Sequence, residues 1–125
     1  GEDISSYGVI EPRAVEERTY HILNMVEKPP ADKAPSDLAI IGRYILRPEI
    51  FEILAETTPG KGGEIQLTDA MATLLKRQAI YGYQFEGTRY DAGDKLGFLK
   101  ATVEIALDRE DIGPEFREFL KNLEL

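Results

Sequence analysis

The run of residues 38–46 constrains the fold more than any other part of the sequence. Apart from Gly42 and Arg43, its residues are all apolar or aromatic. A nearly continuous apolar run of this kind is typical of a strand that is buried on both faces inside an α/β sheet. We therefore expect this segment to form the core strand of the protein.

The rest of the sequence alternates between extended and helical patterns. Strands are expected over 7–11, closed by Pro12, over 20–26, and over 80–85, the first two pairing as a hairpin. Apolar residues at helical spacing predict helices from Pro48, along 67–75, after a cap at Asp94, and from Gly113. Because strands and helices intermix, the sequence predicts an α/β fold with crossover connections and a mixed sheet.

Length and charge limit the class of protein. With 125 residues, of which 42% are hydrophobic, the chain is expected to form one globular unit over residues 1–125. Its 15 basic and 23 acidic residues give a net charge of -8, which argues against a general affinity for nucleic acid or for anionic membranes. An anionic ligand would therefore have to be held by a few well-placed cations.

The residue types that are missing narrow the chemistry further. The chain has no cysteine, which excludes disulfides, thiol catalysis and zinc-thiolate sites and is compatible with a reducing compartment. No apolar run reaches the roughly 20 residues needed to span a bilayer, and the first residues lack the pattern of a signal peptide. We therefore expect a cytoplasmic protein, and the missing initiator methionine suggests a fragment.

The first candidate site is at Glu27 and Lys28, where a predicted strand ends at Pro29. Neighbouring strand residues point to opposite faces, so both side chains cannot serve the same packed surface. At a strand end that opens into a cleft, the carboxylate could accept hydrogen bonds from sugar hydroxyls, and the ammonium group could bind a phosphate. The alternative is that both are ordinary solvated residues.

The second candidate is Asp91, which follows a predicted strand and precedes Gly93 and a helix start. Ligands of open α/β sheets bind at such positions. The carboxylate of Asp91 could help to hold Mg²⁺, which usually takes one or two protein carboxylates and completes its shell with water and phosphate. The alternative is that Asp91 is a turn residue, as Asp94 is expected to be a helix cap.

Three glycine positions remain. Gly8 and Gly42 lie in strand-like runs, where glycine often marks a bulge or a close approach by a ligand, and either could make room for a sugar ring. The Gly-Lys-Gly-Gly run at 60–63 lacks the preceding strand, the glycine spacing and the Ser or Thr of a P-loop. We interpret this run as a hinge or connector.

Five segments in order resemble the bacterial UTP:glucose-1-phosphate uridylyltransferase family, over about residues 7–111. They are Tyr-Gly-Val at 7–9, Val-Glu-Lys-Pro at 26–29, Ala-Ile-Ile-Gly-Arg-Tyr at 39–44, Gly-Gly-Glu-Ile-Gln-Leu-Thr-Asp at 62–69 and Tyr-Asp-Ala-Gly-Asp-Lys-Leu-Gly at 90–97. Each segment is weak evidence alone, but the ordered set is specific. The fourth and fifth segments favour this family over the related thymidylyl- and adenylyltransferases.

The resemblance implies that the chain is the C-terminal, sugar-phosphate-binding part of a single Rossmann-like nucleotidyltransferase domain. In that family the first half carries a glycine-rich nucleotide loop and a Mg²⁺-binding aspartate, and neither is found in this sequence. By resemblance, Gly8 lies against the glucose ring, Glu27 binds its hydroxyls, and Gly42 lines the same pocket. Lys28 would contact the sugar phosphate, and Asp91 would match a second metal-binding aspartate, which makes Lys28 and Asp91 the expected catalytic residues.

The implied reaction joins UTP and glucose-1-phosphate to form UDP-glucose and pyrophosphate. We expect the chain to be inactive alone, because it lacks the nucleotide loop, and to self-associate, because half a domain leaves a strand edge and apolar helix faces uncovered. A sister nucleotidyltransferase with another base or sugar remains an alternative. So does a non-catalytic sugar-phosphate-binding domain.

Overall fold

The computed structural model describes residues 4–124. The chain divides into two compact units, Gly1–Phe85 and Glu86–Leu125. That both units belong to a single nucleotidyltransferase domain stays a prediction. None of the helices in the described part is long and apolar enough to cross a membrane.

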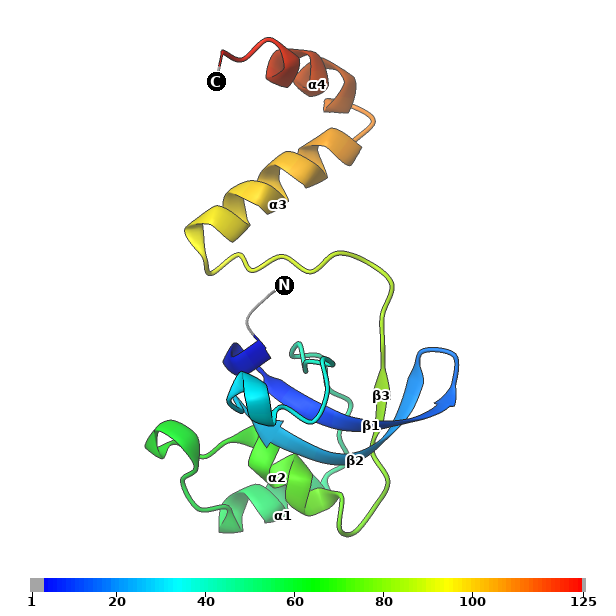
Figure 1. Cartoon of the computed structure of the whole chain (residues 1–125), viewed down its shortest axis with the longest axis vertical. Helices are drawn as coiled ribbons and strands as arrows, with labels where there is room; N and C mark the ends of the chain where they lie inside the picture. Colours follow the sequence, from blue (N-terminus) through cyan, green and yellow to red (C-terminus); the bar gives the residue numbers. More distant parts are fainter. Residues whose placement is uncertain (1–3, 125) are drawn as a thin grey trace. The chain divides into compact units, whose positions relative to one another are not determined.

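The first unit is built on an antiparallel hairpin (Figure 1). Strand β1 (Gly8–Glu16) pairs with β2 (Thr19–Glu27), and the register places Gly8 opposite Glu27. The hairpin was predicted, but the expectation that β1 ends before Pro12 is wrong. The register shifts between Glu11 and Pro12, and β1 is an edge strand, so a residue without an N–H group is tolerated there.

Strand β3 (Tyr81–Tyr83) completes the sheet by pairing antiparallel with β2. The strand order is β1-β2-β3, and all pairs among residues 4–124 are antiparallel. The described residues contain both helices and strands, which confirms the α/β fold class, although the parallel pairing expected of a mixed sheet does not occur among them. The strand predicted over 80–85 is present but shorter.

The core strand predicted over residues 38–46 does not form. Only Ala39 makes a strand-like bridge, to Val9, while the Ile40 amide donates to the Gly8 carbonyl at 2.8 Å. Beyond this point Gly42 adopts a positive φ of 77°, which ends the extended conformation, and Ile45 is fully exposed. The apolar run therefore touches the edge of β1 and then leaves the sheet.

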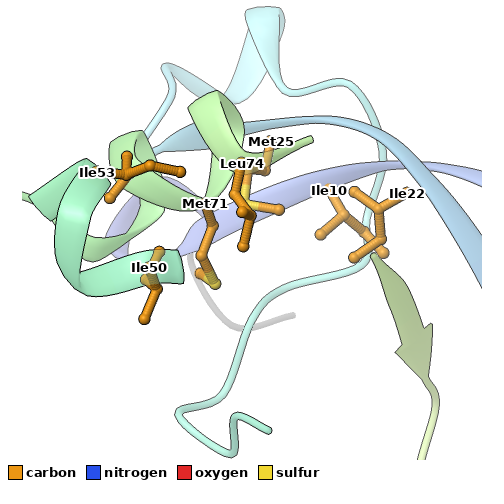
Figure 2. Close-up of a cluster of buried hydrophobic side chains, with 8 residues drawn as sticks. Ile10, Ile22, Met25, Ile50, Ile53, Met71 and Leu74 are labelled. Carbon is orange, nitrogen blue, oxygen red and sulfur yellow. The ribbon is translucent and has the colours of Figure 1, made fainter. Parts of the chain in front are cut away.

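Two helices cover one face of the hairpin. Helix α2 (Leu67–Leu74) packs on β2, and α1 (Glu49–Glu56) packs on α2. Figure 2 shows the resulting core, which contains side chains from β1, β2 and both helices. Its buried members are Ile10, Ile22, Met25, Ile50, Ile53, Ala70, Met71 and Leu74. Short 3₁₀ turns occupy Ile4–Ser6, Ala31–Lys33 and Lys61–Gly63.

The second unit contains α3 (Lys95–Asp108) and α4 (Gly113–Lys121). The predicted cap is confirmed, because the Asp94 carboxylate accepts a hydrogen bond from the Gly97 amide at 2.8 Å. The expected apolar stripe of α3 is uncovered in its first half, where Leu96 and Leu99 are 58% and 59% exposed. Phe119 of α4 is similarly exposed, so both helices present apolar side chains to solvent.

Candidate functional site

The first candidate site lies at the end of β2, where Glu27 and Lys28 leave the sheet. Lys28 has a positive φ of 44°, which is unusual for a residue with a side chain, and its amide donates to the Tyr7 carbonyl at 2.9 Å. This conformation breaks the alternation of the strand. As a result, the Lys28 Nζ atom lies 3.9 Å from the Glu27 Oε1 atom, and the two charges share one side of the strand end.

Thr68 holds the other carboxylate oxygen of Glu27. The Thr68 hydroxyl, in the first turn of α2, donates to Glu27 Oε2 at 2.5 Å, and Thr68 is only 5% exposed. The positive end of the α2 dipole lies at this turn and favours a negative charge. Glu27 is thus a largely buried carboxylate, 13% exposed, with a fixed orientation.

The absence of a side chain at Gly8 allows Glu27 and Thr68 to lie close to β1. A Cβ atom at Gly8 would come within 3.1 Å of both Glu27 Oε2 and Thr68 Oγ1 and within 3.2 Å of Ile40 Cδ1. Gly8 is therefore required for close packing against the carboxylate. Its contact with a glucose ring stays a prediction.

The segment around Gly42 also contains Tyr44, whose phenol is influenced by the charge of Glu27. Partial burial and, next, the negative charge of Glu27 raise the pKa of the Tyr44 phenol above its ordinary value. Gly42 itself is exposed, and a Cβ atom there would meet nothing within 4 Å. The positive φ at position 42 favours glycine over residues with a side chain. That Gly42 lines the sugar pocket stays a prediction.

Lys61 brings a second cation to the strand end. Its Nζ atom donates to the Lys28 carbonyl, and its own carbonyl accepts from Gln66 Nε2 at 2.9 Å. The run at 60–63, interpreted from sequence as a connector, therefore also contacts the candidate site. Its Gly62 and Gly63 both have φ of 77°.

Asp91 lies in the second unit, in the loop before α3. Its Oδ1 atom accepts from the Gly93 amide at 2.9 Å, and its Oδ2 atom lies 3.5 Å from an Arg89 guanidinium nitrogen. A Cβ atom at Gly97 would lie 2.3 Å from the Asp91 carbonyl oxygen, so this glycine permits the loop to approach α3. Asp91 is thus a turn residue, which was the alternative to a metal ligand. Its side chain is half exposed.

Whether these residues suit Mg²⁺ depends on the oxygen donors present. Asp91 offers one hard carboxylate with an exposed edge, which is a suitable ligand. Asp94 is engaged as a helix cap, and the described residues contain no group of three or more potential metal ligands. Asp91 fits as one ligand of a site whose other ligands are water, phosphate or a second carboxylate. That Asp91 shares a cleft with Glu27 and Lys28 stays a prediction.

Sequence reasoning missed Thr68 and Lys61. Thr68 lies within the helix predicted along 67–75, and no spacing rule links it to Glu27, which lies 41 residues earlier. The contact arises only because α2 packs on β2. Its membership in the Leu-Thr-Asp part of the resemblance was the one available signal.

This arrangement belongs to a known class of proteins. Residues 1–107 match the nucleotidyl transferase family, and the chain belongs to that family. Within it, the chain is similar to enzymes named for one reaction. It is 52% identical over 122 residues to the UTP–glucose-1-phosphate uridylyltransferase of Streptococcus pyogenes. It is 56% identical over 120 residues to a Methanocaldococcus jannaschii protein provisionally given the same name.

Solved structures similar to this chain carry names of the same activity as these relatives. A UDP-glucose pyrophosphorylase complexed with UDP-glucose is 54% identical, with a TM-score of 0.81 over 86% of this chain. A UTP-bound enzyme of the same kind from Acinetobacter baumannii is 36% identical, with a TM-score of 0.82 over 98% of this chain. The chain spans 39% and 41% of the two curated relatives, and 41% and 42% of these two structures.

Proposed function

We propose that this chain is the sugar-phosphate-binding part of a UTP:glucose-1-phosphate uridylyltransferase. The observation that carries the proposal is the Glu27–Lys28 pair, in which an oriented carboxylate and an exposed ammonium group share one side of a strand end. This pair suits a ligand that has both hydroxyls and a phosphate. The names of the relatives supply the particular sugar phosphate and nucleotide.

Each predicted residue has a role in this proposal. Glu27 accepts hydrogen bonds from glucose hydroxyls, and Lys28 contacts the phosphate of glucose-1-phosphate. Gly8 keeps the strand close to Glu27, and Gly42, with its positive φ, lines the same sugar pocket. UTP is the second substrate, and the loop that holds its phosphates is not found in this sequence.

Mg²⁺ is the proposed cofactor, with Asp91 as one ligand. When bound, the ion would draw negative charge from the phosphates of the nucleotide. The half-exposed carboxylate and its position before α3 support this role. Its Arg89 neighbour keeps the carboxylate paired in the absence of the ion.

The reaction is an in-line attack by a phosphate oxygen of glucose-1-phosphate on the α-phosphorus of UTP, which expels pyrophosphate. Both reactants are anions, and the protein has little covalent chemistry to perform, so positioning and charge compensation dominate. Lys28 reduces the repulsion between the reactants at the sugar-phosphate side. Glu27 orients the sugar so that the attacking oxygen faces the nucleotide.

The substrate assignment is tested with the full-length protein that contains this sequence. We expect UDP-glucose from UTP and glucose-1-phosphate with Mg²⁺, and activity about 100-fold lower with dTTP, ATP or other sugar 1-phosphates. Preference for another base or sugar would assign a sister transferase. No transfer with any pair, but binding of glucose-1-phosphate, would instead support a sugar-phosphate-binding domain. The 125-residue chain alone is expected to form no UDP-glucose.

The protein is also expected to self-associate. Apolar side chains of α3 and α4 are exposed, among them Phe98, Leu99 and Phe119, and such surfaces commonly become interfaces. Sedimentation velocity of the 125-residue chain over a wide concentration range should show a dimer or larger species. Leu99→Glu should shift it toward monomer, while Lys100→Glu on the same helix should not. A monomer at all concentrations would contradict this expectation.

The cellular setting follows from the proposed reaction. UDP-glucose synthesis is a step of carbohydrate metabolism, and its nucleotide substrate is found in the cytoplasm. The lack of cysteine is compatible with that reducing compartment. We therefore retain a cytoplasmic location as part of the proposal.

A further inference from the structure

We infer that Thr68 is a positioning residue that fixes the Glu27 carboxylate for recognition of the sugar hydroxyls. This inference rests on the proposed function. It concerns how the site distinguishes glucose-1-phosphate from sugars with other hydroxyl patterns. Thr68 itself need not contact the substrate.

The position of the Thr68 hydroxyl is set by the core. Thr68 is in the first turn of α2, and the same helix buries Ala70, Met71 and Leu74 against β2 and α1. A buried hydroxyl needs a hydrogen-bond partner, and Glu27 Oε2 is at 2.5 Å. Because the core holds α2 in place, the Thr68 hydroxyl holds one carboxylate oxygen of Glu27 in a fixed position.

Gly8 limits the same oxygen from the opposite strand. The position of a Cβ atom at Gly8 lies 3.1 Å from Glu27 Oε2, so this oxygen is packed between β1 and α2. The other oxygen, Oε1, faces Lys28 Nζ at 3.9 Å. Because Oε2 accepts from Thr68 and is also packed against Gly8, Oε1 is the oxygen that we assign to accept a hydrogen bond from a sugar hydroxyl. Its direction follows from the Thr68 bond.

The test compares Thr68→Val with Thr68→Ser in the full-length protein. Valine has nearly the same shape but cannot donate, whereas serine retains the hydroxyl. We expect valine to raise the KM for glucose-1-phosphate about 10- to 100-fold, as for loss of a hydrogen bond to a charged group, with the KM for UTP unchanged. Serine should restore the KM for glucose-1-phosphate to within a few-fold of the original.

A double-mutant cycle separates positioning from a general structural effect. In a Glu27→Ala background, Thr68→Val should cause no further rise in the KM for glucose-1-phosphate. A rise of the same size in both backgrounds, or equal rises for UTP and glucose-1-phosphate, would overturn the inference. If Thr68→Val does not fold, Thr68→Ala takes its place in the cycle, because alanine adds no atoms to the buried site.

The outcome also separates this inference from the proposed function. If the parent protein forms no UDP-glucose but binds glucose-1-phosphate by calorimetry, the proposed reaction fails, and the same variants test Thr68 through the dissociation constant. If the parent forms UDP-glucose and Thr68→Val leaves the KM unchanged, only the Thr68 inference fails. If the parent neither reacts with nor binds glucose-1-phosphate, both are overturned.

Discussion

Replacing Lys28 by methionine in the full-length protein is expected to lower the rate of UDP-glucose formation about 100- to 1,000-fold, by analogy with removal of a single charge-stabilising donor. Methionine keeps the length and apolar stem of the side chain but removes the ammonium group. The phosphate of glucose-1-phosphate would then approach the nucleotide without its nearest proposed cation. The repulsion between the two anions would no longer be offset on that side.

The measurement is steady-state release of pyrophosphate with UTP and glucose-1-phosphate. Lys33→Met is the matched control, because Lys33 is an exposed lysine in the short turn Ala31–Lys33 that follows the site. It should change the rate less than about 2-fold, the effect of an ordinary surface substitution. Retention of most activity by Lys28→Met would remove Lys28 from the proposed mechanism.

Leu74→Ala is expected to destabilise the first unit by about 2–5 kcal/mol, the range for a leucine truncated in a core. The Leu74 side chain is 1% exposed and packs among the side chains of Figure 2. Truncation removes apolar surface from the core that β1, β2, α1 and α2 share, and it leaves a cavity. A loss of this size is a large part of the stability of a small domain.

Urea unfolding of the 125-residue chain, followed by circular dichroism, measures this loss. Leu23→Ala is the matched control, since Leu23 lies in β2 of the same unit but is 46% exposed. It should cost less than about 1 kcal/mol, because little apolar surface is lost from the interior. Equal losses in the two variants would contradict the assignment of Leu74 to the core.

The helices and the hairpin were predictable because their signals are local. Asp94 caps α3 as the sequence indicated, and α2 follows the apolar spacing of 67–75 closely. Prediction from local patterns was wrong for residues 38–46, which do not form the expected core strand. Apolar content predicts burial. It does not predict that Gly42 turns the chain away from the sheet after a single bridge at Ala39.

The candidate site was predictable only where its residues are adjacent in sequence. Glu27 and Lys28 were recognised as neighbours of opposite charge that could share a ligand only where the strand ends. The positive φ of Lys28 is the backbone feature that brings the two side chains together, and φ cannot be read from a lysine in a sequence. Thr68 and Lys61 reach the site through the packing of α2 and the loop before it, which is tertiary information.

The backbone of Lys28 has a consequence for how this position can evolve. Lys28 has a left-handed backbone conformation, which costs less free energy for glycine or asparagine than for lysine. Under the proposed function, selection for thermal resistance alone would tend to replace the lysine, while selection for turnover would retain it. The strain at this residue is a small thermodynamic cost of placing a cation at the strand end.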